Sequence, residues 1–444
     1  MSPLLNMLSN KKIILSKISL FFAPFLISAQ TLQENIQHNL NAYFSKDHAV
    51  KNYVAITKDS FLLYAGPLAR TKKEKPEFAL SWKQVKILSA FINKLSTKEL
   101  EDLLVMKKDS LDFYMAKYST DTVLLQAASP SSLKGLKVAI DPGHIGGTYS
   151  MGKSESRCMT LYCDSINKAD SIRLIEGNLT FFTALILKKK LEDNGAEVML
   201  TRKDTGISAL DITYYKWKEL IKNPLYIDSL VDANLLPPKD VRLLGLKLQD
   251  KVLFEKVFGS VDMAERAKKM NAFHPDVSVV IHYNVNEQNA GWAHPTGKDY
   301  VMTFVGGCIV SKDLETKAGR LNFLRLLISP DIENSINFSS KVIHHLSNDL
   351  GIPIARKEDA TYLAHNCIST KANGVYSRDL ALTRIIRGTL VYGEALYQDN
   401  EKECRLLSTN DDSLQGCSFS KRIELVADSY YKGILDYLAG QQKK

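Results

Sequence analysis

Four residues that can bind a metal ion or transfer a proton stand at or near the ends of predicted strands. They are His144 after VAIDPG, Glu176 in IEGNL, His282 in VVIHYN and Glu394 in LVYGEALYQDN. Two imidazoles and one carboxylate are a complete protein ligand set for catalytic zinc, with a fourth position left for water. A second carboxylate is what such a site needs to handle protons. The four together predict a metal hydrolase.

Each of these residues has an ordinary structural interpretation when it is taken alone. A histidine after a strand is more often a hydrogen-bonded structural residue than a ligand. Glu176 fits an acid in the first turn of a helix, where it faces the positive end of the helix dipole. Glu394 fits an exposed loop acid. The prediction therefore depends on the joint placement of the four residues.

The elements that must position them alternate between strand and helix from Leu136 onward. LKVAIDPGH, AEVMLTR, DVSVVIH and GTLVYGE read as strands, and NLTFFTALILKKKLEDNG reads as a helix with an apolar face. Apolar strands between helices indicate a mostly parallel sheet covered on both faces. Ligands of such sheets bind at the carboxyl ends of the strands. We therefore predict an α/β fold in which the four residues converge at one sheet edge.

Three further parts surround this sheet. Residues 30–130 predict a separate α+β module without a chemical motif, and the linker-like ASPSSLKG follows it. The module's role stays open. Residues of about 207–260 and about 306–335 predict helical insertions that cover or border the site. We expect the catalytic domain to span residues 134–440.

The N-terminus has the pattern of a secretory signal. Three lysines precede the apolar run ISLFFAPFLISA, which ends at Ala29 in a small-residue context. This run is shorter than the roughly 20 residues that cross a bilayer. A cleaved signal over residues 1–29 is preferred to an uncleaved anchor or a buried helix. We thus expect an exported protein of the periplasm or cell envelope, without a stable transmembrane span.

The charge of the exported form is mildly basic. Cleavage removes three lysines and no acids, so Lys+Arg falls from 58 to 55 against 49 acids and the charge becomes +6. This suits an anionic polymer or envelope surface, and it suits ordinary surface charge equally well. No run of basic residues with interleaved aromatics indicates nucleic acid.

The six cysteines form no paired CxxC set, so a thiolate zinc site is not expected. In an oxidising compartment Cys158–Cys163 and Cys404–Cys417 are plausible local bridges. Free buried thiols are the alternative, and the sequence does not decide between them.

The DPGH segment adds geometry to the predicted site. Pro142 and Gly143 turn the chain directly after the strand, and Gly146 and Gly147 keep the following backbone compact. Asp141 has two interpretations. It is either an acceptor that orients a metal ligand or an Asp that caps the turn.

Residues of about 136–400 resemble the zinc-dependent N-acetylmuramoyl-L-alanine amidases. This chain has DPGHIGG where the family has DPGHGG. The family then has a glutamate that opens a helix running to GAEVxLTR, and the matching segment here is EGNLTFFTALILKKKLEDNGAEVMLTR. Next the family has an Arg and Asn before a strand ending SIHxN, and the matching segment here is AERAKKMNAFHPDVSVVIHYN. The family's last motif is LVExxFxxN, and here it reads LVYGEALYQDN. The four motifs occur in the family's order.

The resemblance implies zinc held by His144, Glu176 and His282, with Glu394 as general base and acid. It implies hydrolysis of the amide between N-acetylmuramic acid and L-alanine in peptidoglycan, for wall remodelling or daughter-cell separation. Asn284 and Arg202 match polar motif residues and are expected to bind substrate or support the ligands. A zinc peptidase for another bond, or a wall-binding relative without activity, is the alternative.

This sequence departs from the family pattern at several positions. His144 and Glu176 are 32 positions apart, which is more than the pattern predicts, and Gly393 directly precedes Glu394. In some relatives an inserted helix covers the active site until a partner displaces it. The segment 306–335 occupies the corresponding interval, so an inhibitory helix and a protein activator are a further hypothesis, with a rim helix as the preferred alternative.

Overall fold

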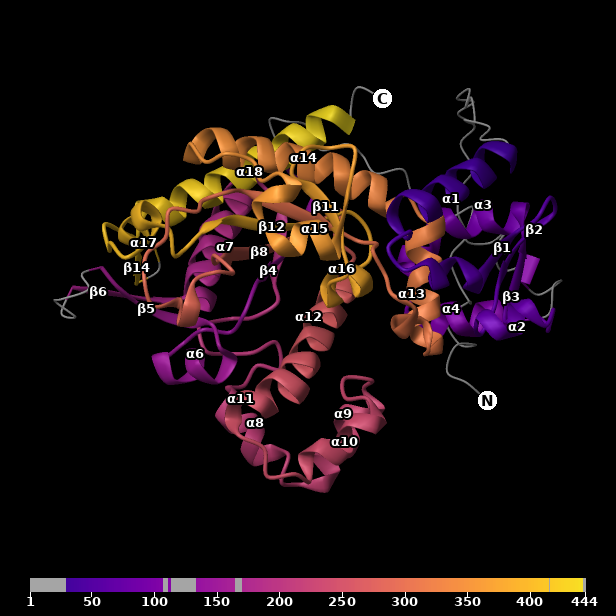
Figure 1. Ribbon diagram of the computed structural model, residues 1–444, viewed down its shortest axis with the longest axis horizontal. Helices are drawn as coiled ribbons and strands as arrows, with labels where there is room; N and C mark the ends of the chain where they lie inside the picture. Colours follow the sequence, from indigo (N-terminus) through magenta and orange to yellow (C-terminus); the bar gives the residue numbers. More distant parts are fainter. Residues whose placement is uncertain (1–28, 107–110, 113–132, 164–169, 415, 442–444) are drawn as a thin grey trace, which may run out of the picture.

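The computed structural model describes residues 29–106, 111–112, 133–163, 170–414 and 416–441. Residues 1–28 of the predicted signal and the strand expected at DTVLLQA lie outside the described residues. Figure 1 shows the central sheet with helices around it, a module in indigo that precedes it in sequence, and an arm of helices that extends away from it. The boundaries between the predicted domains remain predictions.

A seven-stranded sheet forms the centre, in the order β10-β11-β9-β12-β8-β4-β7. Neighbouring strands run parallel in four of its six pairings, and β12–β9 and β10–β11 are antiparallel. The predicted α/β class with a mostly parallel sheet is confirmed. The strand bounds are β4 Lys137–Pro142, β7 Glu197–Leu200, β8 Val277–Asn284, β9 Met302–Val305, β10 Cys367–Ser369, β11 Val375–Arg378 and β12 Leu390–Tyr397.

Apolar residues lie on both faces of the sheet because helices cover both. Alternate residues of a strand point to opposite faces. Val279 and Ile281 of β8 belong to the large core under α7, α14 and α18, whereas Val280 packs with Ala267 and Met270 of α12. The helix bounds are α7 Glu176–Asp193, α12 Gly259–Phe273, α14 Asp331–Leu350, α16 Ala381–Ile385 and α18 Lys421–Gln441.

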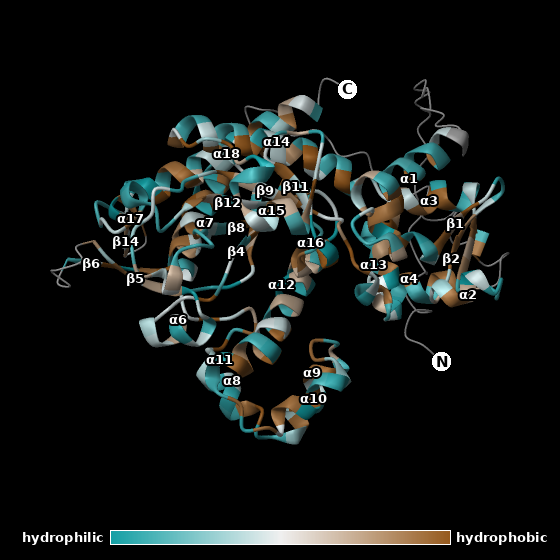
Figure 2. Ribbon diagram, in the orientation of Figure 1, coloured by the Kyte–Doolittle hydropathy of each residue, from teal (hydrophilic) through white to brown (hydrophobic). Residues whose placement is uncertain are grey.

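The predicted helical insertion at 207–260 is confirmed as an arm with its own small core. Tyr214, Trp217, Phe254 and Phe258 pack at its centre in tilted and edge-on contacts. Figure 2 shows hydrophobic residues within the arm, from α8 to α10. The arm comprises α8 Tyr214–Leu220, α9 Pro224–Asp232, α10 Pro238–Leu244, α11 Asp250–Leu253 and a π-helical turn, Phe254–Phe258, that leads into α12.

The N-terminal module is a three-stranded antiparallel sheet with helices beside it. Its sheet has the order β1-β2-β3, and Ser81 and Ser96 cap helices α3 and α4 in capping boxes with Gln84 and Glu99. The bounds are α1 Ala29–Tyr43, β1 Val54–Ile56, β2 Ser60–Leu63, α2 Pro67–Thr71, β3 Phe78–Ser81, α3 Trp82–Phe91 and α4 Thr97–Leu104.

Helix α13, Lys317–Ile328, does not occupy the expected inhibitory position. It lies against the N-terminal module (Figure 1), where Phe323 packs edge-on against Phe44 at 5.1 Å and Arg320 pairs with Glu77. Its apolar side chains need this cover, and Leu324 and Leu327 are fully buried. None of residues 306–335, all of which are described, lines a cavity at the predicted site. The hypothesis of an inhibitory helix here is wrong.

The remaining elements complete the described chain. All six cysteines are free thiols, so the structure has neither of the two local bridges considered from the sequence. Among the described helices none is both long and apolar enough to cross a membrane. The other bounds are α6 Tyr149–Glu155, β5 Cys158–Tyr162, β6 Ser171–Ile175, α15 Thr361–Asn366, α17 Glu401–Leu407, β13 Asp412–Leu414 and β14 Cys417–Phe419.

Gly393 in β12 gives a test of how tightly the sheet packs beside Glu394. A Cβ atom at this position would lie 2.0 Å from Oη of Tyr430 on α18, which is fully buried. We expect Gly393→Ala to lower the free energy of unfolding by about 1–3 kcal/mol through overpacking. Urea denaturation of the variant measures this loss.

Two further variants make the test specific. Gly297→Ala is the matched control, because no atom lies within 4 Å of its added Cβ. Tyr430→Phe removes the clashing oxygen, so Gly393→Ala should cost less in that background. An equal cost in both backgrounds would contradict the packing argument.

Candidate metal centre and active site

Three of the predicted residues lie within contact of one another at the carboxyl edge of the sheet. One ligand atom each from His144, Glu176 and His282 lies within 4.8 Å of the other two. Glu176 Oε1 is 3.3 Å from His144 Nε2 and 3.1 Å from His282 Nδ1. The predicted convergence of distant segments is present in the fold. The atoms offered are two nitrogens and one carboxylate oxygen, which is a zinc-type donor set.

Each ligand comes from a different kind of element. His144 stands in the loop after β4, Glu176 is the first residue of α7 as expected, and His282 lies within β8. The sequence predicted that the two strands end at His282 and Glu394, but both strands continue past them, and the two residues are register partners. Their strands extend further because Tyr283, Leu396 and Tyr397 are also buried.

Two close contacts hold the imidazole of His282. Its ring stacks on Tyr392 with centroids 4.6 Å apart and an interplanar angle of 6°. On its other side a Cβ at Gly143 would lie 2.3 Å from the ring, so only glycine fits before His144. Burial and the charge of His144 outweigh Glu176 and lower the pKa of His282, which favours the neutral form that binds metal.

Positive charge is favoured between the ligands. Burial alone would raise the pKa of Glu176, but its contacts with the two histidines hold that pKa well below the usual value. Burial disfavours a charged His144, yet the carboxylates of Glu176 and Glu155 outweigh it and raise the pKa of His144 to about 9. A buried cluster with this bias is suited to holding a cation.

Glu394 lies in the wall of a cavity of about 300 Å³ that the three ligands also line. Burial, and next the negative charge of Glu176, raise the pKa of Glu394 to about 8, while the guanidinium of Arg378 opposes this shift. A carboxyl group with a pKa near neutrality can both accept and return a proton under working conditions. A second cavity of about 280 Å³ adjoins it at His144 and His282.

The other predicted site residues have distinct places. Asn284 lines the cavity and donates to the hydroxyl of Tyr362 at 2.7 Å. Asp141 contacts no ligand ring; it accepts hydrogen bonds from Arg266 and Thr201. Arg202 is fully buried, lines neither cavity, and donates to the carbonyls of Pro142 and Gly177. Arg202 therefore supports the ligand loops from behind, whereas Asp141 is joined to Arg266 and also lines the second cavity.

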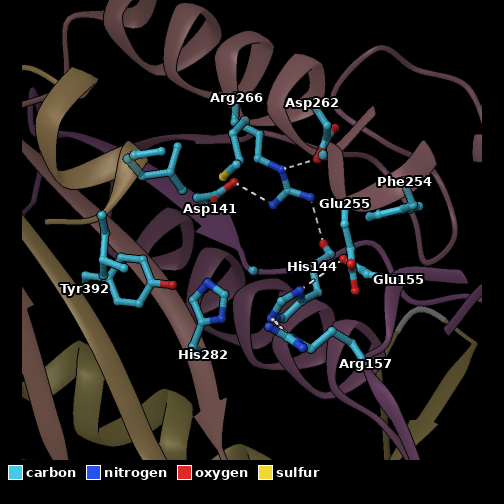
Figure 3. Close-up of a pocket in the computed structure, with 16 residues that line it drawn as sticks. Asp141, His144, Glu155, Arg157, Phe254, Glu255, Asp262, Arg266, His282 and Tyr392 are labelled. Carbon is cyan, nitrogen blue, oxygen red and sulfur yellow. Dashed lines mark hydrogen bonds and ion pairs between the residues drawn. The ribbon is translucent and has the colours of Figure 1, made fainter. Parts of the chain in front are cut away.

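Several residues at the site were missed by the sequence reasoning. Figure 3 shows Glu155, Arg157 and Arg266 around His144. Arg266 donates to the carbonyl oxygens of Pro142 and His144, both at 2.7 Å, and pairs with Asp262 and Asp141. Its motif, AERAKKMN, was part of the resemblance and was the available signal. Glu155 and Arg157 carried no such signal, because they lie inside the long interval between two ligands.

Comparison with known proteins agrees with the predicted family. A family model for N-acetylmuramoyl-L-alanine amidases matches residues 138–416. No curated protein matches this chain.

Among solved structures, similar chains include three amidases. The CwlD amidase of Clostridioides difficile, in complex with the GerS lipoprotein, is 17% identical over 69% of this chain and 100% of its own, with a TM-score of 0.36. Ami1 of Mycobacterium smegmatis is 16% identical over 70% and 100%, with a TM-score of 0.38. The catalytic domain of CwlV from Bacillus (Paenibacillus) polymyxa var. colistinus is 16% identical over 68% and 98%, with a TM-score of 0.35.

The family match covers more than half of the 444 residues and includes His144, Glu176, His282 and Glu394. The chain belongs to the family of N-acetylmuramoyl-L-alanine amidases, hydrolases that act on the peptidoglycan of the cell wall.

Proposed function

We propose that this protein is a zinc amidase of the cell envelope that cuts the bond between N-acetylmuramic acid and L-alanine during wall remodelling. His144, Glu176 and His282 hold the metal, and Glu394 transfers protons. The mutual approach of the three ligand atoms within 4.8 Å, in a buried setting that favours positive charge, is the observation that carries the proposal.

The residues fit zinc by their chemistry. Two imidazoles and one carboxylate leave a coordination position open, and Tyr392 and Gly143 restrict the orientation of the His282 ring. Bound zinc in such a set polarises a carbonyl group and makes water more acidic. Calcium and magnesium prefer an all-oxygen set, which this site does not offer.

Glu394 is placed for proton transfer because it shares the cavity with all three ligands. Its carboxylate accepts a proton from the attacking water and then donates that proton to the departing nitrogen of alanine. The pKa raised to about 8 makes the second step favourable, and Arg378 keeps the first step possible by stabilising the ionised form. Asn284 offers amide groups at the wall of the same cavity.

Replacement of Glu394 tests the proton-transfer role. We expect Glu394→Gln to lower turnover of purified peptidoglycan by about 10²–10⁴-fold, because the amide cannot accept the proton. Folding and zinc content should be retained. Glu287→Gln, at the exposed rim of the cavity, is the matched control. Normal turnover by a folded, zinc-loaded Glu394→Gln protein would exclude Glu394 as the base.

Metal removal tests the cofactor. We expect about one zinc per chain by elemental analysis, loss of activity with a chelator, and recovery with added zinc. His282→Ala should lose both zinc and activity, since two donors are too few for a stable site. Product analysis identifies the bond: free lactyl groups on muramic acid and intact stem peptides support the proposal, and products of any other cleavage contradict it.

The charge of Arg378 gives a pH test with a defined sign. Because its guanidinium lowers the pKa of Glu394, Arg378→Gln should raise that pKa. The ionised base would then form only at higher pH. The acidic limb of the plot of kcat against pH should therefore move to higher pH. Arg378→Lys keeps the charge and should move the limb less. An unchanged limb in Arg378→Gln would show that Arg378 does not tune the base.

A further inference from the structure

The described part of the segment between His144 and Glu176, residues 145–163 and 170–175, folds back toward these two predicted ligands. It contains α6, Tyr149–Glu155, and the antiparallel hairpin β5–β6. Where α6 ends, Ser156 adopts a left-handed backbone with φ 58°, and this turn directs the chain toward the site. The backbone N–H of Glu176 then donates to the carbonyl of Arg157 at 3.1 Å. The long interval therefore places Glu155 and Arg157 beside both ligands.

Glu155 is the last residue of α6, and its side chain is 7% exposed. Its carboxylate lies 3.0 Å from Nδ1 of His144 and accepts hydrogen bonds from the backbone N–H of Ile145 at 3.0 and 3.1 Å. The N–H of Gly146 points to it at 3.4 Å. Figure 3 shows this carboxylate on the side of the imidazole opposite His282. One buried carboxylate thus holds both the ring and the loop of a predicted zinc ligand.

The partners of the two ring nitrogens distinguish their roles. Arg157 Nε donates to Nε2 of His144 at 3.1 Å, so this nitrogen carries the lone pair, and the same nitrogen lies 3.3 Å from Oε1 of Glu176. The ring hydrogen then belongs on Nδ1, where Glu155 accepts it. A carboxylate that accepts from the far nitrogen of a ligating histidine fixes its tautomer and makes the ligating nitrogen more basic. Nε2 is therefore the ligand atom of His144.

The backbone of His144 needs this support. Its φ of 59° lies in the left-handed region, which is unfavourable for a residue other than glycine and persists only where neighbours enforce it. Arg266 holds the carbonyl oxygens on one side of the residue, and Glu155 holds the N–H groups that follow it. Removal of Glu155 would leave the N–H of Ile145 without its carboxylate partner.

We propose that Glu155 is a positioning residue that keeps the ring hydrogen of His144 on Nδ1, directs Nε2 toward the metal position and thereby sets the zinc affinity of the site. This inference rests on the proposed function, because it assumes that His144 binds the metal. A purely structural role for Glu155 in capping the loop would affect stability without affecting metal affinity. The two roles are separable by measuring zinc directly.

The test measures zinc affinity of the full chain by competition with a chromogenic chelator. Glu155→Gln keeps an oxygen for the N–H of Ile145 but offers the ring a neutral acceptor, and we expect zinc to bind about 10–100-fold more weakly. Glu155→Asp keeps the negative charge and should recover part of the loss. Glu255→Gln is the matched control, since its carboxylate bonds to Ser156 and not to His144. Its zinc affinity should equal that of the wild type.

A second readout separates position from stability. Nitrogen-15 spectra of the histidine rings should show a hydrogen on Nδ1 of His144 in the zinc-loaded wild type. The activity that Glu155→Gln loses at limiting zinc should return when zinc is in excess. Equal zinc affinity in wild type and Glu155→Gln would overturn the inference. A wild type that binds no zinc would instead overturn the proposed function.

Discussion

The buried carboxylate of Glu176 is the constraint on which the rest of the site depends. Its side chain is 5% exposed, and an ionised carboxylate out of water is costly unless it is paired and hydrogen-bonded. Its partners are His144 in the loop after β4 and His282 in β8, and the backbone N–H of Tyr283 also points to it. The fold must therefore bring β4, β8 and the first turn of α7 together, or the charge is left uncompensated.

Two buried arginines carry this requirement into the scaffold. Arg202 bonds to the carbonyls of Pro142 and Gly177 and so ties the turn after β4 to the start of α7. Arg266 of α12 bonds to the carbonyls of Pro142 and His144 from the opposite face of the sheet. The DPGH turn is thus held from both faces. Asp141, which the sequence suggested as a ligand partner, acts through Arg266, and so its effect on His144 is indirect.

The sequence predicted those parts of the site whose signals are local. The spacing of apolar residues predicts the strands β4, β8 and β12 and the helix that begins at Glu176. Convergence of the site residues at one sheet edge follows from the parallel pairing of these strands. Glu155 and Arg157 could not be found in this way. Helix α6 has only seven residues, so it shows no clear periodicity, and its link to His144 is made by a fold-back that no spacing rule gives.

The hypothesis that α13 covers the active site was wrong for a related reason. The sequence shows an apolar helix, but the partner that buries it is decided by tertiary structure, here by Phe44 and the rest of the N-terminal module. The extent of β8 and β12 was also set by tertiary burial. Residues beyond the expected ends, such as Leu396, pack in the core and keep the backbone extended through Glu394.

The helical arm and the α6 segment act on the same loop, although they are far apart in sequence. Ile145, directly after His144, is 3% exposed and packs into the arm's core with Tyr214, Trp217 and Phe258. Its N–H bonds to Glu155 of the α6 segment, so its side chain and its backbone are held by different insertions. α12 continues from the arm and carries Arg266, the third support of that loop. Both insertions are consequently part of the machinery that aims His144, because the left-handed backbone of this ligand is stable only while its neighbours hold it.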